Sequence, residues 1–181
     1  MREGLGTTLT AMPSARRTLP SLLLCAALLA GCATPDRDPR LQPGRSNEAE
    51  VVALYGQPGR VWPEADGGRT LEYSGQPMGR HTWMVTLDAA GRLVGVIDAL
   101  SPAGRARVQP GMTPEQVSRL LGRERSRMFF RNSGEDVWDW TIEPDQTGYG
   151  LRFNVHFKDG VVVRTTQSMV FPSRLFPGMD D

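Results

Sequence analysis

The residues with most capacity for chemistry are four carboxylates that lie close together in the second half of the chain. They are Asp136, Asp139, Glu143 and Asp145. Oxygen ligands of this kind suit Ca²⁺, but a calcium loop contains a glycine that lets the ligands surround one ion. No glycine lies between Asp139 and Asp145. We therefore expect a solvated strand face there, and we predict no metal and no cofactor.

The other reactive residue types form no pattern of a catalytic site. The histidines are His81 and His156, and His156 falls on the polar face of an expected strand, where solvent is its expected neighbour. A zinc site needs several His or Cys ligands at set spacings, and the sequence has no Gly-x-Ser-x-Gly elbow and no P-loop. We predict a protein that is not an enzyme. The alternative is an enzyme with an unfamiliar site, which would require a pocket with perturbed carboxylates.

One cysteine has a context that gives its thiol a defined reaction. Arg16 and Arg17 precede an apolar run from Leu19 to Leu29, which is too short for a membrane-spanning helix of roughly 20 residues. The sequence Leu29-Ala30-Gly31-Cys32 then resembles the lipobox of bacterial lipoproteins, in which the cysteine receives a diacylglyceryl group. The resemblance implies that residues 1–31 are a signal peptide and that Cys32 begins the mature chain. An ordinary secretory signal and a buried apolar helix are the alternatives.

Acylation of Cys32 would hold the mature chain at a membrane, because two or more acyl chains bind firmly where one binds marginally. Ala33 follows the cysteine. By resemblance to enterobacterial lipoproteins, an aspartate there would favour the inner membrane, so we expect a lipid anchor in the outer membrane, on its periplasmic face. Residues 32–44, rich in proline and charge, are expected to form a lipidated tether. Met12 is a second possible start, because a complete signal follows it.

The charge balance argues against a nucleic-acid partner. The chain has 21 basic and 20 acidic residues, and removal of the expected signal peptide leaves it nearly neutral. Nucleic-acid binding needs a concentrated basic face. Cys25 lies in the signal and Cys32 would be acylated, so we expect no disulfide within the mature chain.

The elements that would position these residues form an internal repeat. Residues 46–62 and 113–130 each run from a polar cap through a short apolar helix to a glycine and then a basic, aromatic segment. Aligning Gly56 with Gly122 superimposes the apolar positions of the two helices. Thr113 and Gln116 have the spacing of a capping box, and both glycines fall where a helix ends in a positive φ.

Strands follow each helix. Alternating apolar and polar residues predict strands at 70–75 and 81–98 in the first copy, and at 136–142 and 152–167 in the second. The last range of each copy is expected to hold two strands joined by a tight acidic-glycine turn, at 88–91 in the first copy and at 158–160 in the second. Short strands at 60–62 and 128–130 would complete the set. We predict an α+β fold of two tandem repeats, 45–100 and 108–170. Each is a short helical segment followed by a three- or four-stranded antiparallel sheet.

The second copy carries a more specific resemblance. Gly-Met-Thr from Gly111, then Gln-Val, Leu-Leu-Gly, a tryptophan strand and Phe-x-x-Gly-x-Val ending at Val162 resemble the BamE-like (SmpA/OmlA) family of small outer-membrane lipoproteins. The family's proline after the helix glycine is present as Pro58 but replaced by Glu124 in the second copy. The resemblance implies a non-catalytic accessory subunit of the machinery that assembles β-barrels in the outer membrane, with other lipoproteins as binding partners and anionic lipid as a further option. We therefore expect a role in barrel assembly or envelope integrity. Two such units in tandem also look like β-lactamase-inhibitor proteins, which leaves a periplasmic inhibitor or sensor as the alternative.

Adjacent aromatic residues are the best candidates for a partner interface. Phe129 and Phe130 would point to opposite faces of a strand, so one could be exposed, and aromatic residues with flanking arginines are common anchors of interfaces. In the alternative, one fills the core and the other packs on the neighbouring copy. Four tryptophans are expected in the core or between the copies: Trp62, Trp83, Trp138 and Trp140. The apolar tail, residues 171–181, could dock on its own sheet or on a partner.

Overall fold

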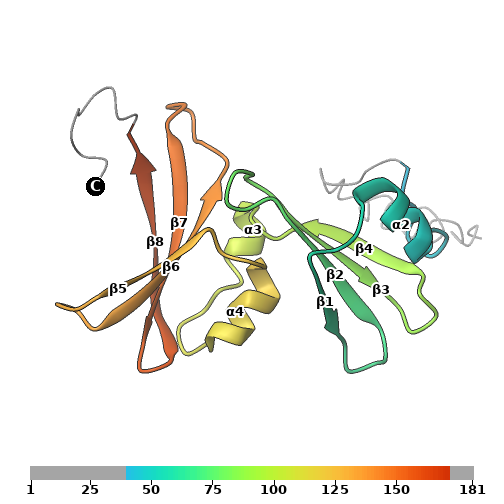
Figure 1. Cartoon of the computed structure of the whole chain (residues 1–181), viewed down its shortest axis with the longest axis horizontal. Helices are drawn as coiled ribbons and strands as arrows, with labels where there is room; N and C mark the ends of the chain where they lie inside the picture. Colours follow the sequence, from blue (N-terminus) through green and yellow to red (C-terminus); the bar gives the residue numbers. More distant parts are fainter. Residues whose placement is uncertain (1–39, 172–181) are drawn as a thin grey trace, which may run out of the picture. The chain divides into compact units, whose positions relative to one another are not determined.

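The structure is a computed structural model, and it describes residues 40–171 of the chain. The expected signal peptide, the lipobox with Cys32, most of the tether and residues 172–181 of the tail lie outside the described residues. The first half of the described chain, residues 40–100, and the second half, residues 101–171, each contain one sheet (Figure 1).

Both sheets have four antiparallel strands in sequential order. The first consists of β1 (Arg60–Pro63), β2 (Arg69–Ser74), β3 (Thr82–Leu87) and β4 (Leu93–Asp98). The second consists of β5 (Ser126–Phe130), β6 (Glu135–Ile142), β7 (Gly150–Lys158) and β8 (Val161–Val170). The helices are α2 (Glu48–Tyr55), α3 (Pro102–Arg105) and α4 (Pro114–Leu121). The α+β class and the tandem pair of antiparallel sheets agree with the prediction.

Helices α2 and α4 begin and end in the same way. The predicted capping box of α4 is present, since the Thr113 side chain accepts from the Gln116 N–H and the Gln116 side chain accepts from the Thr113 N–H. Asn47 and Glu50 make the equivalent pair at the start of α2. Both helices end at a glycine with positive φ, +80° at Gly56 and +73° at Gly122, as the sequence predicts.

The first sheet buries the face that carries Leu71, Val85, Leu87 and Leu93, and Val51 of α2 packs in the same cluster. Its other face carries Glu72 and Met84, which pair across β2 and β3. Both side chains are nevertheless buried. The second half of the chain covers part of this face, as the contacts described below establish.

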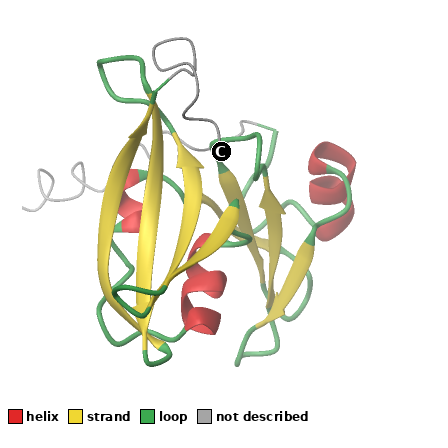
Figure 2. Ribbon diagram, turned by 60° about the vertical axis from the view of Figure 1, so that its left-hand side comes forward, coloured by secondary structure: helices red, strands yellow, loops and turns green. Residues whose placement is uncertain are grey.

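The second sheet has one buried and one open face. Apolar and polar residues alternate along β7 as predicted, so Leu151, Phe153, Val155 and Phe157 are buried. They form a core with Trp138 and Trp140 of β6 and with Val117 and Leu121 of α4. Figure 2 shows α3 and α4 on one side of this sheet. The predicted hairpin at 158–160 is present, with positive φ at Asp159 and Gly160.

Helix α3 was absent from the sequence prediction. Its N-cap is Ser101, whose hydroxyl accepts from the Gly104 N–H, and Pro102 occupies the first turn. A Cβ at Gly104 would lie 2.2 Å from the Ala99 carbonyl oxygen, so only glycine permits this close approach. Leu100 and Val108 flank α3 and pack in the second core, so the link between the sheets is itself part of that core.

Candidate functional site

The predicted interface residues lie on edge strand β5. Phe129 is 62% exposed and Phe130 is 46% exposed, beside an exposed Met128. Phe129 pairs with Asp136 and Phe130 with Glu135, so the two rings point to opposite faces of the sheet, as expected. Neither ring lies in the core, and the alternative of one buried and one packed ring does not hold. We call Met128, Phe129 and Phe130 the β5 cluster.

The position of β5 explains why the β5 cluster is exposed. Among residues 40–171 the strand pairs with β6 alone, and a turn closed by the Gly134 N–H and the Phe130 carbonyl follows it. Helix α4 packs its Val117 and Leu121 in the core with residues of β6 and β7, and no residue of β5 belongs to that core. Met128 and Phe130 are exposed on one face of this strand and Phe129 on the other, so apolar side chains are exposed on both sides of the sheet edge.

The open face of the second sheet carries Asp139. Its carboxylate accepts hydrogen bonds from the Arg125 guanidinium and from the Ser126 hydroxyl. These neighbours leave Asp139 only 9% exposed, so the expectation of a solvated side chain is wrong for this residue. A shallow pocket of about 270 Å³ lies beside it, with Phe130 and Met128 at one side.

A second carboxylate on this face, Glu135, contacts Arg164 and His156. Arg164 donates two hydrogen bonds to Glu135, and His156 Nδ1 lies 3.0 Å from Glu135 Oε2. The Arg164 guanidinium, and then His156, lower the pKa of Glu135 from 4.5 to about 2. His156 Nε2 also lies 2.9 Å from the Thr166 hydroxyl. His156 was expected in solvent, but it is a partly buried member of a hydrogen-bond network.

The other acidic residues do not converge. Glu143 lies near Arg80, and Asp145 accepts from the Thr147 hydroxyl, which lowers the pKa of Asp145. Within residues 40–171 no three His, Cys, Asp or Glu side chains are grouped so that they could hold a metal ion. None of the helices in that range is both long and apolar enough to cross a membrane.

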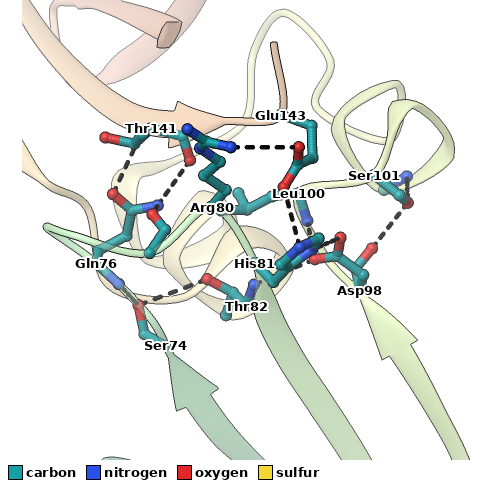
Figure 3. Close-up of polar contacts among 12 residues, drawn as sticks. Ser74, Gln76, Arg80, His81, Thr82, Asp98, Leu100, Ser101, Thr141 and Glu143 are labelled. Atoms are coloured by element: carbon teal, nitrogen blue, oxygen red, sulfur yellow. Dashed lines mark hydrogen bonds and ion pairs between the residues drawn. The ribbon is translucent and has the colours of Figure 1, made fainter. Parts of the chain in front are cut away.

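The two halves of the chain are joined by polar contacts that the sequence did not reveal (Figure 3). We call these contacts the junction. Gln76, which follows β2, donates from Nε2 to the Thr141 carbonyl at 2.8 Å and accepts from the Thr141 N–H at 3.1 Å. The side-chain amide therefore satisfies both main-chain polar groups of a residue in β6.

His81 lies between carboxylates from both halves of the chain. Its Nδ1 is 2.8 Å from Asp98 Oδ2, and its Nε2 is 3.2 Å from Glu143 Oε1. Asp98 also accepts from the Thr82 and Leu100 N–H groups through Oδ1. Figure 3 shows the imidazole between the two acidic side chains.

Glu72 is the most buried ionisable residue of the junction, at 2% exposed. Its carboxylate accepts from Trp62 Nε1 at 2.9 Å and from the Arg123 N–H, just after α4, at 2.7 Å. Arg119 of α4 lies over the Trp62 ring and donates to the Pro63 carbonyl. Trp62 thus lies between the halves, and Trp138 and Trp140 lie in the core, as expected. Trp83 belongs to neither core cluster; it is partly exposed and stacks on His81.

Comparison with known proteins finds one similar curated sequence. No family model matches the chain. The outer membrane protein assembly factor BamE of Neisseria meningitidis serogroup B (strain ATCC BAA-335 / MC58) is 38% identical over 69 residues, which are 36% of this chain and 53% of that protein. The chain therefore spans about half the length of this relative. The similarity is weak and supports a BamE-like resemblance over that part of the chain.

Two solved structures are similar in outline only. A DUF4309 family protein (YjgB) from Bacillus subtilis has 17% identity and a TM-score of 0.26, with 72% of this chain and 82% of that chain covered. A putative beta-lactamase inhibitor protein from Streptococcus mutans has 12% identity and a TM-score of 0.28, with 68% and 82% covered. At these scores neither structure carries an argument about this protein.

Proposed function

We propose that this protein is an outer-membrane-anchored periplasmic lipoprotein that acts as a non-catalytic binding or assembly factor. Its process would be the assembly of β-barrel outer-membrane proteins or the maintenance of envelope integrity. The observation that carries the proposal is the β5 cluster, an exposed apolar surface on an edge strand. The weak similarity to a protein named as an outer membrane protein assembly factor supports the same process.

We divide the chain into five segments. Residues 1–31 are the signal peptide, 32–44 the lipidated tether, 45–100 a divergent first repeat, 108–170 a second repeat, and 171–181 a C-terminal tail. Each repeat is a helix-first copy of one BamE-like unit. The matching capping boxes and glycine ends of α2 and α4 support this assignment.

The anchor would be attached at Cys32, with Leu29, Ala30 and Gly31 as the recognition sequence for processing. A tether of about 12 residues in an extended, proline-rich conformation reaches on the order of 37 Å. The folded part could therefore contact a membrane-bound complex while its own anchor stays in the lipid.

The expected partner is a protein of the barrel-assembly machinery. Protein interfaces take most of their affinity from a few buried aromatic anchors, and Phe129 and Phe130 are exposed in the described chain. Two faces of one strand carry the rings, so a partner would have to wrap around the edge of the sheet to bury both.

Photo-crosslinking in cells tests the proposal. A photoreactive residue is placed at 129 or 130 of the lipidated protein, and the captured proteins are identified by mass spectrometry. Position 94, an exposed valine on edge strand β4 of the other sheet, is the matched control. Capture of barrel-assembly subunits from 129 or 130, but not from 94 and not in a Cys32→Ser variant, is the expected result. Capture of a soluble periplasmic enzyme would overturn the assembly role in favour of an inhibitor.

A further inference from the structure

We propose that a cleft beside the junction binds an acidic peptide segment of a partner protein. The cleft lies where α2 ends, β1 begins and β2 ends, and Arg123, Glu124 and Arg127 of the second half form its other wall. Its volume is about 760 Å³, within the range of sites that hold ligands larger than a single ion. The β5 cluster is not part of its lining, so this site is separate from the one proposed above.

Positive charge is concentrated in the cleft. Four arginines line it, Arg60, Arg80, Arg123 and Arg127, against two carboxylates, Glu72 and Glu124. Both carboxylates are already engaged: Glu72 accepts from Trp62 and from the Arg123 N–H, and Glu124 accepts from Arg127 Nε. The chain as a whole is nearly neutral, so this excess of positive charge is local.

Two of the four guanidinium groups are available to a ligand. Arg60 lies over the Trp62 ring but, within residues 40–171, pairs with no carboxylate, and the same holds for the exposed Arg123 side chain. Arg80 is 3.7 Å from Glu143, a distance at which an exposed pair contributes little. Guanidinium groups bind carboxylates and phosphates through two parallel hydrogen bonds, so the ligand should present acidic groups, and the other residues of the cleft decide between a peptide and an anion or lipid.

Aromatic rings form another part of the lining, beside glycines and small polar residues, and they favour a peptide over a free anion. Tyr55 and Tyr73 contact each other with ring centroids 5.3 Å apart, and His81 stacks on Trp83. Rings of this size offer a peptide side chain an apolar contact that a small free anion would not use.

A recessed site also favours a peptide over a membrane surface. Two acidic side chains lie within the cleft, and Glu72 on its lining is buried. The phosphates of a bilayer form a flat layer, and a flat layer contacts the side chains that project from a protein surface. A peptide can instead enter a cleft and contact the residues that line it. Arginine and aromatic residues together are the types most enriched in protein interfaces.

Fluorescence anisotropy with the full chain tests the inference. The probe is a fluorescein-labelled peptide, Asp-Glu-Tyr repeated twice, measured at about 50 mM and about 300 mM salt. We expect binding that weakens with salt, and at least a tenfold weaker dissociation constant for the Arg60→Ala/Arg123→Ala double variant. Arg45→Ala, which removes an exposed arginine outside the cleft, should bind as the unaltered chain does. Circular dichroism of the double variant checks that it is folded.

Three results would overturn the proposal. Equal affinity of the folded double variant and the unaltered chain would show that the cleft is not the site. Displacement of the peptide by millimolar inorganic phosphate, or tighter binding to phosphatidylglycerol vesicles than to the peptide, would assign the arginines to a simple anion or to lipid. None of these results depends on the β5 cluster or on the lipid anchor.

Discussion

The side chain of Gln76 and the main chain of Thr141 pair as two peptide groups of neighbouring strands would, through hydrogen bonds of 2.8 and 3.1 Å. Gln76 is buried. This pair links the loop between β2 and β3 of the first sheet to a strand of the second, and it satisfies both main-chain polar groups of Thr141. Its loss should therefore weaken the attachment of the two halves.

The first prediction concerns this pair. Gln76→Ala would leave the Thr141 N–H and carbonyl without their partner, and we expect a loss of about 1–3 kcal/mol in the free energy of unfolding. Gln167→Ala on exposed strand β8 is the control and should change it by less than about 0.5 kcal/mol. Urea denaturation measures both. Equal midpoints for the two variants would show that the pair does not stabilise the fold.

The second prediction separates backbone strain from contact between the halves. Gly56 and Gly122 both have positive φ, so alanine at either position should cost about 1–2 kcal/mol. A Cβ at Gly56 meets nothing within 4 Å, but at Gly122 it would lie 2.7 Å from Thr82 Cγ2 and 3.0 Å from the Glu72 carboxylate. Gly122→Ala should therefore be the more destabilising variant by at least about 1 kcal/mol. Equal losses in urea denaturation would contradict the close approach at Gly122.

Sequence patterns predicted most of the individual helices and strands because interactions between neighbouring residues determine where these elements form. The alternation in β7, the capping box at Thr113 and the glycine ends of the helices each depend on a few neighbouring residues. Helix α3 escaped prediction because its four residues include a glycine, whose role is a close approach to Ala99 rather than helix formation.

The junction could not be predicted, because its residues have the sequence pattern of a solvated face. Glu72 alternates with Leu71 and Tyr73, as an outward-facing polar residue of a strand would, yet the second half of the chain buries it. The same reason applies to Asp139, which Arg125 and Ser126 cover. When residues distant in the sequence bury a polar side chain, the neighbouring residues in the sequence do not indicate it. The tryptophan at position 62 was the one signal, because an aromatic residue on an edge strand suggests a covered surface.

The third prediction concerns pH. Arg164 and His156 lower the pKa of Glu135 to about 2 from 4.5. A carboxyl with a lowered pKa in the folded chain binds fewer protons there than in the unfolded chain, so its stabilisation is full above about pH 4.5 and is lost as the pH falls toward about 2. The difference in unfolding free energy between the unaltered chain and Glu135→Gln should shrink over that window. NMR titration of the Glu135 carboxyl carbon measures the pKa directly, and a midpoint near 4.5 would contradict the prediction.

The fourth prediction separates binding from stability at the β5 cluster. Phe129→Ser/Phe130→Ser removes two exposed rings, so the free energy of unfolding should fall by no more than about 1 kcal/mol. Phe153→Ala, by contrast, empties a core position and should cost about 3–5 kcal/mol. The serine variant should nevertheless lose its partner in co-purification from detergent-solubilised membranes, because the partner would take its apolar anchors from these rings. A stable serine variant that retains every partner would remove the β5 cluster from the binding surface and leave the cleft beside the junction as the site to test.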